Sequence, residues 1–216
     1  MYRIVAKERL AYKHTLFTVE APDIAAKARP GQFLIVVPKE GGERVPLSLC
    51  AYDQEAGTVS FAFHEVGRTT KELGTLQEGE GLFNVTGPLG NPSEVRRYGR
   101  VLCIGGGIMI APALLQARAL KEAGNEVITI LACRSAEFLF KREEAERVSD
   151  RVLIASDDGT VGERGLDFLT DLLAKDRIDR CTVIGPVVMM KRVCELTRPF
   201  AVPTIVSLTP IMIDGM

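Results

Sequence analysis

The stretch "CIGGGIMIAP", Cys103–Pro112, carries the clearest chemical signal in the sequence. It follows an apolar run typical of a buried strand and leads into a helix with one apolar face. Glycines at such a strand-to-helix turn let the backbone approach a pyrophosphate, whose charge is favoured by free N–H groups at the helix start. A tight turn that needs positive φ is the alternative, but three consecutive glycines exceed that need. We therefore predict that Gly105, Gly106 and Gly107 bind a nucleotide, although the pattern is not a G-x-G-x-x-G.

Polar residues also follow the next two predicted strands. Arg134, in "LACRSAEFLF", stands where the ribose end of a dinucleotide is normally read. Its guanidinium could take a 2′-phosphate or stack on adenine, and an exposed loop arginine is the alternative. Asp157, Asp158 and Gly159, in "ASDDGTVGERG", form a polar strand-end loop, for which an ordinary Asp-Gly turn is the stronger interpretation.

A fourth motif, "VIGPVVMMKRV", follows another predicted strand. Its Gly-Pro turn, Gly185 and Pro186, leads into a helix and places the proline near the first helical position. Met189 and Met190 on this helix are predicted to pack in the core rather than to contact a cofactor.

The first half of the sequence contains two further motifs. Arg44 and Ser48 lie around a strand in "ERVPLSLCAY". Gly67, Thr69 and Thr70 lie in "VGRTTKEL", at a predicted helix start. Backbone N–H groups and hydroxyls there suit a phosphate, although threonine is also an ordinary N-cap residue. The run "TGPLGNP" is predicted to be a rigid turn that leaves this half of the chain.

Short strands separated by Gly and Pro turns position the motifs of residues 1–97. Their spacing, and their frequent alternation of apolar and polar residues, indicate a six-stranded antiparallel barrel or sandwich. The predicted strands are Tyr2–Leu10, His14–Glu20, Gln32–Val37, Pro46–Tyr52, Thr58–Glu65 and Gly81–Thr86, with a helix near Thr69–Thr75.

From Arg100 the pattern changes to continuous apolar strands that alternate with helices. This alternation predicts a doubly wound parallel sheet in residues 98–216. The expected strands are Arg100–Gly106, Glu126–Ala132, Arg151–Ser156, Arg180–Gly185 and Pro203–Leu208, and the expected helices are Ala111–Ala123, Glu137–Val148, Leu166–Lys175 and Val188–Arg198. Ligands of such a domain bind at the carboxyl ends of the strands, where four of the motifs fall.

The composition argues against several classes of protein. The net charge is −1 and the charges are interspersed, so the sequence contains no basic patch of the kind that binds nucleic acid. No apolar stretch approaches the ~20 residues that span a bilayer. The charged amino-terminal residues do not resemble a signal peptide. Five scattered cysteines without a C-x-x-C pair indicate buried side chains in a reducing cytoplasm. Because the two histidines lack ligand partners nearby in sequence, no metal site is expected.

Taken in order, the motifs resemble those of the ferredoxin–NADP reductase superfamily. The specific marks are "RVPLSL", "VGRTTKEL", "GPLGNP", "SDDGTVGERG", "GPVVMMKRV" and "VSLTPIMIDG", which extend from Arg44 to the end of the chain. They look most similar to the small subunit of NADH-dependent ferredoxin:NADP oxidoreductase, also called the sulfide dehydrogenase small subunit. The electron-transfer subunit of dihydroorotate dehydrogenase is a near relative. The resemblance implies an FAD-binding antiparallel β-barrel in residues 1–97 and an NAD(P)-binding α/β domain in residues 98–216.

The resemblance also assigns residues to two cofactors. Those implied for FAD are Pro46, Leu47 and Ser48 against the isoalloxazine and Gly67, Thr69 and Thr70 at the pyrophosphate, with Arg44, Gly87 and Pro88 completing the set. Those implied for NAD(H) or NADP(H) are Gly105, Gly106 and Gly107, then Arg134, Asp157, Asp158 and Gly159 at the adenosine end, and Gly185 and Pro186 at the nicotinamide end. No catalytic side chain is expected, because the flavin supplies the chemistry.

Three departures from the family pattern modify these expectations. The superfamily favours Arg-x-(Tyr/Phe)-(Ser/Thr), but here Val45–Ser48 align with it and Arg44 comes one position early. Met109 replaces a usual glycine, and crowding there would weaken or shift nucleotide binding. The family continues past "DG" with a cysteine segment that supplies about four ligands of a [2Fe–2S] cluster. We expect Thr209–Gly215 to lead toward such a lobe, which the complete protein would carry and these 216 residues lack.

The predicted function is that of an NAD(P)H-dependent flavoprotein oxidoreductase subunit. Hydride would pass from the nucleotide to FAD, and electrons would leave through the cluster of the complete protein to a larger flavin and iron–sulfur subunit. Two alternatives stay open, namely the dihydroorotate dehydrogenase electron-transfer subunit and a regulatory or structural module of the same fold that has lost its cofactors. The resemblance favours NAD(H), whereas Arg134 favours NADP(H).

Overall fold

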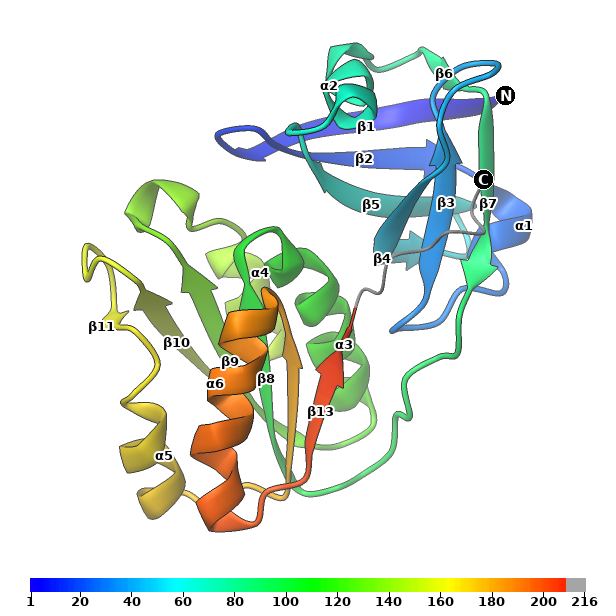
Figure 1. The fold of residues 1–216 in the computed structure, drawn as a ribbon. Helices are drawn as coiled ribbons and strands as arrows, with labels where there is room; N and C mark the ends of the chain where they lie inside the picture. The colour runs from blue at the N-terminus through cyan, green and yellow to red at the C-terminus, as the bar shows by residue number, and fades with distance from the viewer. Residues whose placement is uncertain (209–216) are drawn as a thin grey trace. The chain divides into compact units, whose positions relative to one another are not determined.

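The computed structural model describes residues 1–208, which form two compact units that divide between Ser93 and Glu94 (Figure 1). The predicted lead toward a cluster-binding lobe, Thr209–Gly215, lies outside the described residues. Each unit has its own sheet and is considered by itself.

The first unit is an antiparallel sheet of seven strands within residues 1–93. Its order is β6–β1–β2–β5–β4–β3–β7, with β1 Tyr2–Ala11, β2 His14–Glu20, β3 Phe33–Val37, β4 Val45–Asp53, β5 Thr58–His64, β6 Gly81–Leu82 and β7 Asn84–Leu89. Because the edge strands β6 and β7 are consecutive in the chain, the sheet nearly closes. The expected barrel is confirmed, with seven strands instead of six because Phe83 interrupts the last predicted strand.

Aromatic packing fixes the interior of this barrel. Phe17 on β2 meets Phe61 and Phe63 on β5 edge to face, with ring centroids 6.1 and 5.0 Å apart. The unit also contains α1, Pro22–Ala25, and α2, Arg68–Thr75. Lys7 on β1 donates from Nζ to the carbonyls of Gly74 and Leu76 at 2.8 and 2.7 Å, so the carboxyl end of α2 is tied to the sheet.

The second unit is a parallel sheet of six strands within residues 94–208. Its order is β11–β10–β9–β8–β12–β13, with β8 Arg100–Gly106, β9 Glu126–Cys133, β10 Arg151–Ser156, β11 Glu163–Arg164, β12 Arg180–Ile184 and β13 Thr204–Ser207. The helices are α3 Ile110–Glu122, α4 Arg142–Val148, α5 Leu169–Lys175 and α6 Val187–Thr197. Figure 1 shows α5 and α6 on one face of the sheet and α3 and α4 on the other, which confirms the doubly wound prediction.

Two predicted helices of this unit start later than expected: α5 begins at Leu169 instead of Leu166, and α4 begins at Arg142 instead of Glu137. The stretch predicted as Glu137–Val148 contains a short 3-10 turn, Ala136–Phe138, followed by α4. Lys141 interrupts it with a φ of 56°, a left-handed conformation that a continuous α-helix does not contain.

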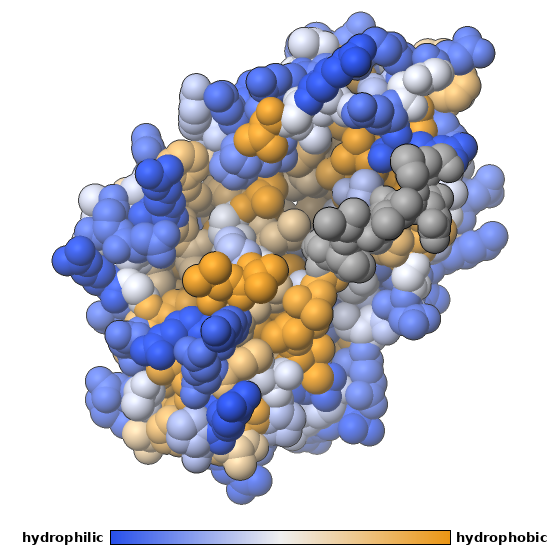
Figure 2. Space-filling view, in the orientation of Figure 1, coloured by the Kyte–Doolittle hydropathy of each residue, from blue (hydrophilic) through white to orange (hydrophobic). Residues whose placement is uncertain are grey.

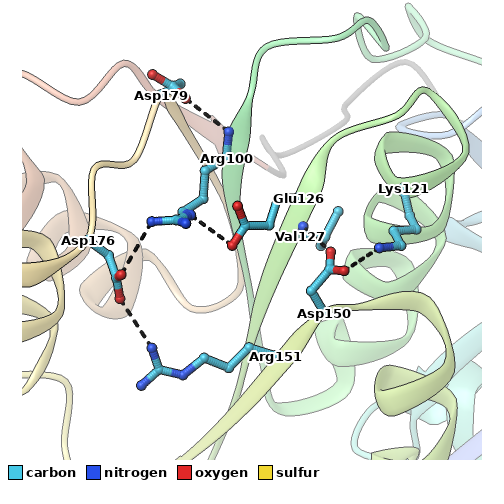
Figure 3. Close-up of polar contacts among 8 residues, drawn as sticks. All are labelled: Arg100, Lys121, Glu126, Val127, Asp150, Arg151, Asp176 and Asp179. Atoms are coloured by element: carbon cyan, nitrogen blue, oxygen red, sulfur yellow. Dashed lines mark hydrogen bonds and ion pairs between the residues drawn. The ribbon is translucent and has the colours of Figure 1, made fainter.

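Charged residues hold the amino-terminal edge of the parallel sheet (Figure 3). Arg100 at the start of β8 places Nε 2.9 Å from Oε1 of Glu126, at the start of β9, and Nη1 3.3 Å from Oδ1 of Asp176. The other oxygen of Asp176 pairs with Arg151, at the start of β10, at 3.1 Å. Asp179 accepts the Arg100 N–H at 2.9 Å. These contacts join three adjacent strands at the edge opposite the glycine motif.

Asp150 gives the same edge a pH-dependent stability. Its carboxylate accepts hydrogen bonds from Lys121 Nζ at 2.5 Å and from the Val127 N–H at 2.8 Å. The Lys121 bond first, and then the Val127 bond, lower the pKa of Asp150 below its ordinary value of 3.8. Because the pKa is lower in the folded state, this stabilisation is complete above the unfolded pKa and is lost as the pH falls through the folded pKa.

We therefore expect Asp150→Asn to reduce the free energy of unfolding by about 0.5 kcal/mol near neutral pH, since the ion pair is partly exposed. The difference from wild type should begin to shrink below about pH 4, where the carboxylate of the unfolded chain protonates, and should vanish only below the lowered folded-state pKa. Urea denaturation near neutral pH and in acid measures this difference in the free energy of unfolding. Glu122→Gln, an exposed charge change next to Lys121, is the control. A deficit that is independent of pH would contradict the proton linkage.

Candidate functional site

A pocket of about 400 Å³ opens at the carboxyl edge of the parallel sheet. The ends of β8, β9 and β10 and the turn after β12 line it. The chain reverses its winding direction between β8 and β12, and sheets of this type bind ligands at that position. Of the residues predicted to hold a nucleotide, five line the pocket: Gly106, Gly107, Arg134, Asp157 and Pro186.

The three consecutive glycines serve different purposes. A Cβ on Gly105 would lie 2.8 Å from the Cα of Ile110, so Gly105 permits α3 to pack closely on β8. A Cβ on Gly106 would lie 2.4 Å from the Sδ of Met189. Gly107 has a φ of +56°, and a Cβ there would meet no described atom within 4 Å. Gly106 and Gly107 therefore face the pocket, whereas Gly105 supports it from behind.

Met189 is a pocket residue that the sequence interpretation placed in the core. Met190 is 3% exposed within the core, as predicted. Met189 packs against that core but also lines the pocket. A Cβ on Gly185 would lie 2.4 Å from the Cε of Met189, so the glycine at position 185 leaves room for the Met189 side chain. Adjacent residues of a helix point about 100° apart, which is why the pair divides between core and pocket.

Both signs of charge occur at the pocket. Arg134 and Asp157 are exposed there, and the Asp157 N–H donates to the Cys133 carbonyl at 3.1 Å, which joins the ends of β9 and β10. Arg192 on α6 was missed by the sequence interpretation. Its Nη2 and Nε donate to Oδ1 of Asp167 at 2.6 and 3.2 Å. Guanidinium groups suit phosphates and a carboxylate suits ribose hydroxyls, so this mixture fits a dinucleotide.

Asp158 and Gly159 form the turn beside Asp157. Oδ1 of Asp158 accepts the Thr160 hydroxyl at 2.7 Å and the Thr160 N–H at 2.9 Å, and these bonds lower the pKa of Asp158. The Thr160 hydroxyl oxygen in turn accepts the Ala136 N–H at 2.9 Å. The turn thus joins the loops after β9 and β10. These contacts agree with the Asp-Gly turn interpretation, and a binding role for Asp158 and Gly159 stays a prediction.

An apolar surface adjoins the pocket. Figure 2 shows hydrophobic residues gathered over the amino-terminal end of α6 and along β13. They include Val187, Val188, Ile205 and Leu208, and Val188 is 81% exposed and also lines the pocket. An apolar ring of a ligand could rest on this part of the wall. Met109 is half-buried in a 3-10 turn outside the lining of this pocket, and its effect on nucleotide binding stays a prediction.

The residues predicted to contact the isoalloxazine lie together on β4 in the first unit. Pro46, Leu47 and Ser48 are half-buried, and Leu47 and Ser48 are paired with Leu34 and Phe33 of β3. A half-buried, mainly apolar strand surface fits a planar ring system. Arg44 is exposed directly before this strand, and Gly87 and Pro88 are half-buried on β7.

The residues predicted to hold the flavin pyrophosphate form the start of α2. Gly67 is the N-cap residue, and its N–H donates to the Thr70 hydroxyl oxygen at 3.1 Å. The Thr69 side chain is buried, and its hydroxyl donates to the carboxylate of Glu43. Hydroxyls and N–H groups at a helix start are the donors that phosphates prefer, so these residues fit the group assigned to them.

No helix within residues 1–208 combines the length and the apolar character needed to cross a membrane.

The chain is similar to several known proteins over nearly its whole length, although no protein-family model matches it. It is 42% identical over 214 residues to the "dihydroorotate dehydrogenase B (NAD(+)), electron transfer subunit homolog" of Thermotoga maritima, covering 98% of this chain and 76% of that protein. It is 31% identical over 191 residues to the probable electron transfer subunit of dihydroorotate dehydrogenase B of Methanocaldococcus jannaschii, covering 87% and 70%. A solved structure of NADH-dependent reduced ferredoxin-NADP oxidoreductase matches with a TM-score of 0.92 and 40% identity, covering 100% of this chain and 78% of that chain.

Proposed function

Since this chain belongs to the family of dihydroorotate dehydrogenase B electron-transfer subunits and their homologues, we propose that it is an NAD(P)H-dependent flavoprotein subunit that transfers electrons to a partner subunit through FAD. The observation that carries this proposal is the mixed-charge pocket beside the glycine turn, at the carboxyl ends of the parallel strands. The protein would be NADH-dependent, like the ferredoxin-NADP oxidoreductase whose structure it resembles.

The residues of the chain have binding and orienting roles in this proposal. When bound, FAD would accept hydride and release electrons, which is chemistry that side chains do not supply. The surface of β4 would orient the ring, and the start of α2 would hold the phosphates. In the second unit Gly106 and Gly107 lack side chains, so the nucleotide pyrophosphate could lie close to their backbone. Met189 and Val188 would provide apolar contact with the nucleotide. No general acid or base is needed.

A flavin titration tests the proposal. We expect the purified protein to take up one FAD and expect NADH to bleach the absorbance of the bound flavin under anaerobic conditions. NADPH should bleach it at least tenfold less efficiently, because Asp157 lies in the pocket wall and disfavours an added phosphate. A protein that binds no FAD would refute the proposal. Bound flavin that neither nucleotide reduces would support a regulatory module that has lost its redox function.

The partner decides between the two electron-transfer assignments. Relatives named as dihydroorotate dehydrogenase subunits favour that enzyme, whereas the solved structure favours a ferredoxin:NADP oxidoreductase. We favour the latter, and isolation of the native complex would identify the larger subunit. The [2Fe–2S] cluster stays a prediction for the complete protein. The cytoplasmic location is also a prediction, supported by the absence of a disulfide within residues 1–208.

A further inference from the structure

The loop between β3 and β4 places a carboxylate at the start of α2. Glu43 in this loop accepts the hydroxyl hydrogen bond of Thr69, whose residue is only 6% exposed. The same loop is joined to α2 by the ion pair between Lys39 Nζ and Glu72 Oε1 at 2.5 Å. The Gly42 N–H donates to the Lys39 carbonyl at 2.9 Å and tightens the loop. Two separate contacts therefore hold the loop against the helix.

The start of α2 favours an anion that the helix itself does not supply. Its first turn contains no acidic residue, and its charged side chains there are Arg68 and Lys71. The N–H groups of a first turn lack intrahelical acceptors and carry a partial positive charge. Glu43 supplies the negative charge from outside the helix. Its carboxylate thus takes the position that a phosphate oxygen would need in order to accept the Thr69 hydrogen bond.

A phosphate and the Glu43 carboxylate compete for one donor. The Thr69 hydroxyl has a single O–H, so it serves one acceptor at a time, and two neighbouring anions repel each other. Building on the proposed flavin function, we propose that Glu43 is a specificity-determining residue of the phosphate subsite. A flavin phosphate displaces Glu43 from Thr69, and this displacement lowers the affinity for every phosphate-bearing ligand.

The consequence is selectivity for a large ligand. FAD also contacts the β4 surface proposed for its ring, and this contact offsets the displacement of Glu43, whereas inorganic phosphate has no such contact. Discrimination by an unfavourable contact against the wrong ligand is a general route to specificity. Riboflavin carries no phosphate, so its binding should not depend on Glu43.

Flavin titrations of Glu43→Gln test this inference, with quenching of flavin fluorescence as the readout. We expect Glu43→Gln to bind FAD about tenfold more tightly than wild type, ~1.4 kcal/mol. Riboflavin affinity should change less than about twofold, because no phosphate meets the substituted side chain. Glu40→Gln makes the same charge change in the same loop and should leave FAD affinity within about twofold of wild type, since charge effects at an exposed site are small. In a Thr69→Val background the Glu43 substitution should have no further effect, because the shared hydroxyl is gone.

Three outcomes would overturn the inference while leaving the proposed function in place. The first is equal or weaker FAD binding by Glu43→Gln in a protein that binds riboflavin normally. The second is an equal gain with riboflavin, which would show a general effect on the ring site. The third is an equal gain with Glu40→Gln, which would show long-range charge rather than the Thr69 contact. Absence of any flavin binding in all variants would refute the proposed function and this inference with it.

Discussion

Gly106→Ala is expected to weaken NADH binding about a hundredfold, ~2.7 kcal/mol. Gly106 has a φ of −118°, so an alanine fits its backbone. The added Cβ would lie 2.4 Å from the Sδ of Met189 and 3.2 Å from the Cδ of Pro186. The thioether is flexible and borders the pocket, so the clash is relieved by moving Met189 into the space proposed for the nucleotide. Calorimetric titration of the FAD-loaded protein with NADH measures the loss.

The double variant Gly106→Ala, Met189→Ala separates the physical causes. If the methionine blocks the pocket, its removal should restore NADH affinity to within about fivefold of wild type, and Met189→Ala alone should have a small effect. FAD affinity, which belongs to the first unit in our proposal, should be equal in all four proteins. A double variant as weak as Gly106→Ala would show that the alanine itself blocks the approach of the nucleotide to the backbone.

The bounds of a strand could be predicted from the sequence where the limits of an apolar run coincided with turn or charged residues. The predicted and observed bounds coincide for β2, β8 and β10. Both bounds of each strand stand beside turn residues or charged positions, so the apolar run and its limits carry the same information. The prediction failed where one residue changed the local backbone. Phe83 divides one predicted strand, and Lys141 delays α4 through a left-handed conformation for which lysine has no preference.

The candidate site was only partly accessible from the sequence. Gly106, Arg134 and Asp157 were found because parallel strands bring their carboxyl ends to one edge, so position along the chain predicts position in space. Arg192 lies in the second turn of α6, and its exposure to the pocket depends on how that helix is rotated on the sheet. Its partner Asp167 is 25 residues away in sequence.

Contacts between distant loops were the least predictable feature. Glu43 and Thr69 are 26 residues apart and belong to a loop and a helix start that the barrel brings together. Each residue has an ordinary explanation in its local sequence, as a charged turn residue and as a helix-start threonine. Their hydrogen bond becomes apparent only in the folded barrel, which brings the loop and the helix start together.

Asp157→Asn is expected to shift the preference between nucleotides about thirtyfold toward NADPH. The wild-type carboxylate lines the pocket at the end of β10, and the 2′-phosphate that distinguishes NADPH carries close to two negative charges. Asparagine keeps the size of the side chain and can still bond a ribose hydroxyl, but it removes the repulsion. Arg134, which lines the same pocket, can then pair with the phosphate without the opposing carboxylate of Asp157. The ratio of kcat/KM for flavin reduction by the two nucleotides measures the shift.

Asp158→Asn is the matched control, because Asp158 is the next residue and carries the same charge. Its carboxylate is held by Thr160 and does not line the described pocket. We expect this variant to change the nucleotide ratio less than about threefold, since an exposed charge outside the pocket is screened by solvent. Equal shifts in both variants would mean that selectivity depends on the net charge of the loop, and not on the one carboxylate in the pocket wall. No shift in either variant would assign the selectivity to another part of the pocket, where Arg192, which pairs with Asp167, is a charged candidate.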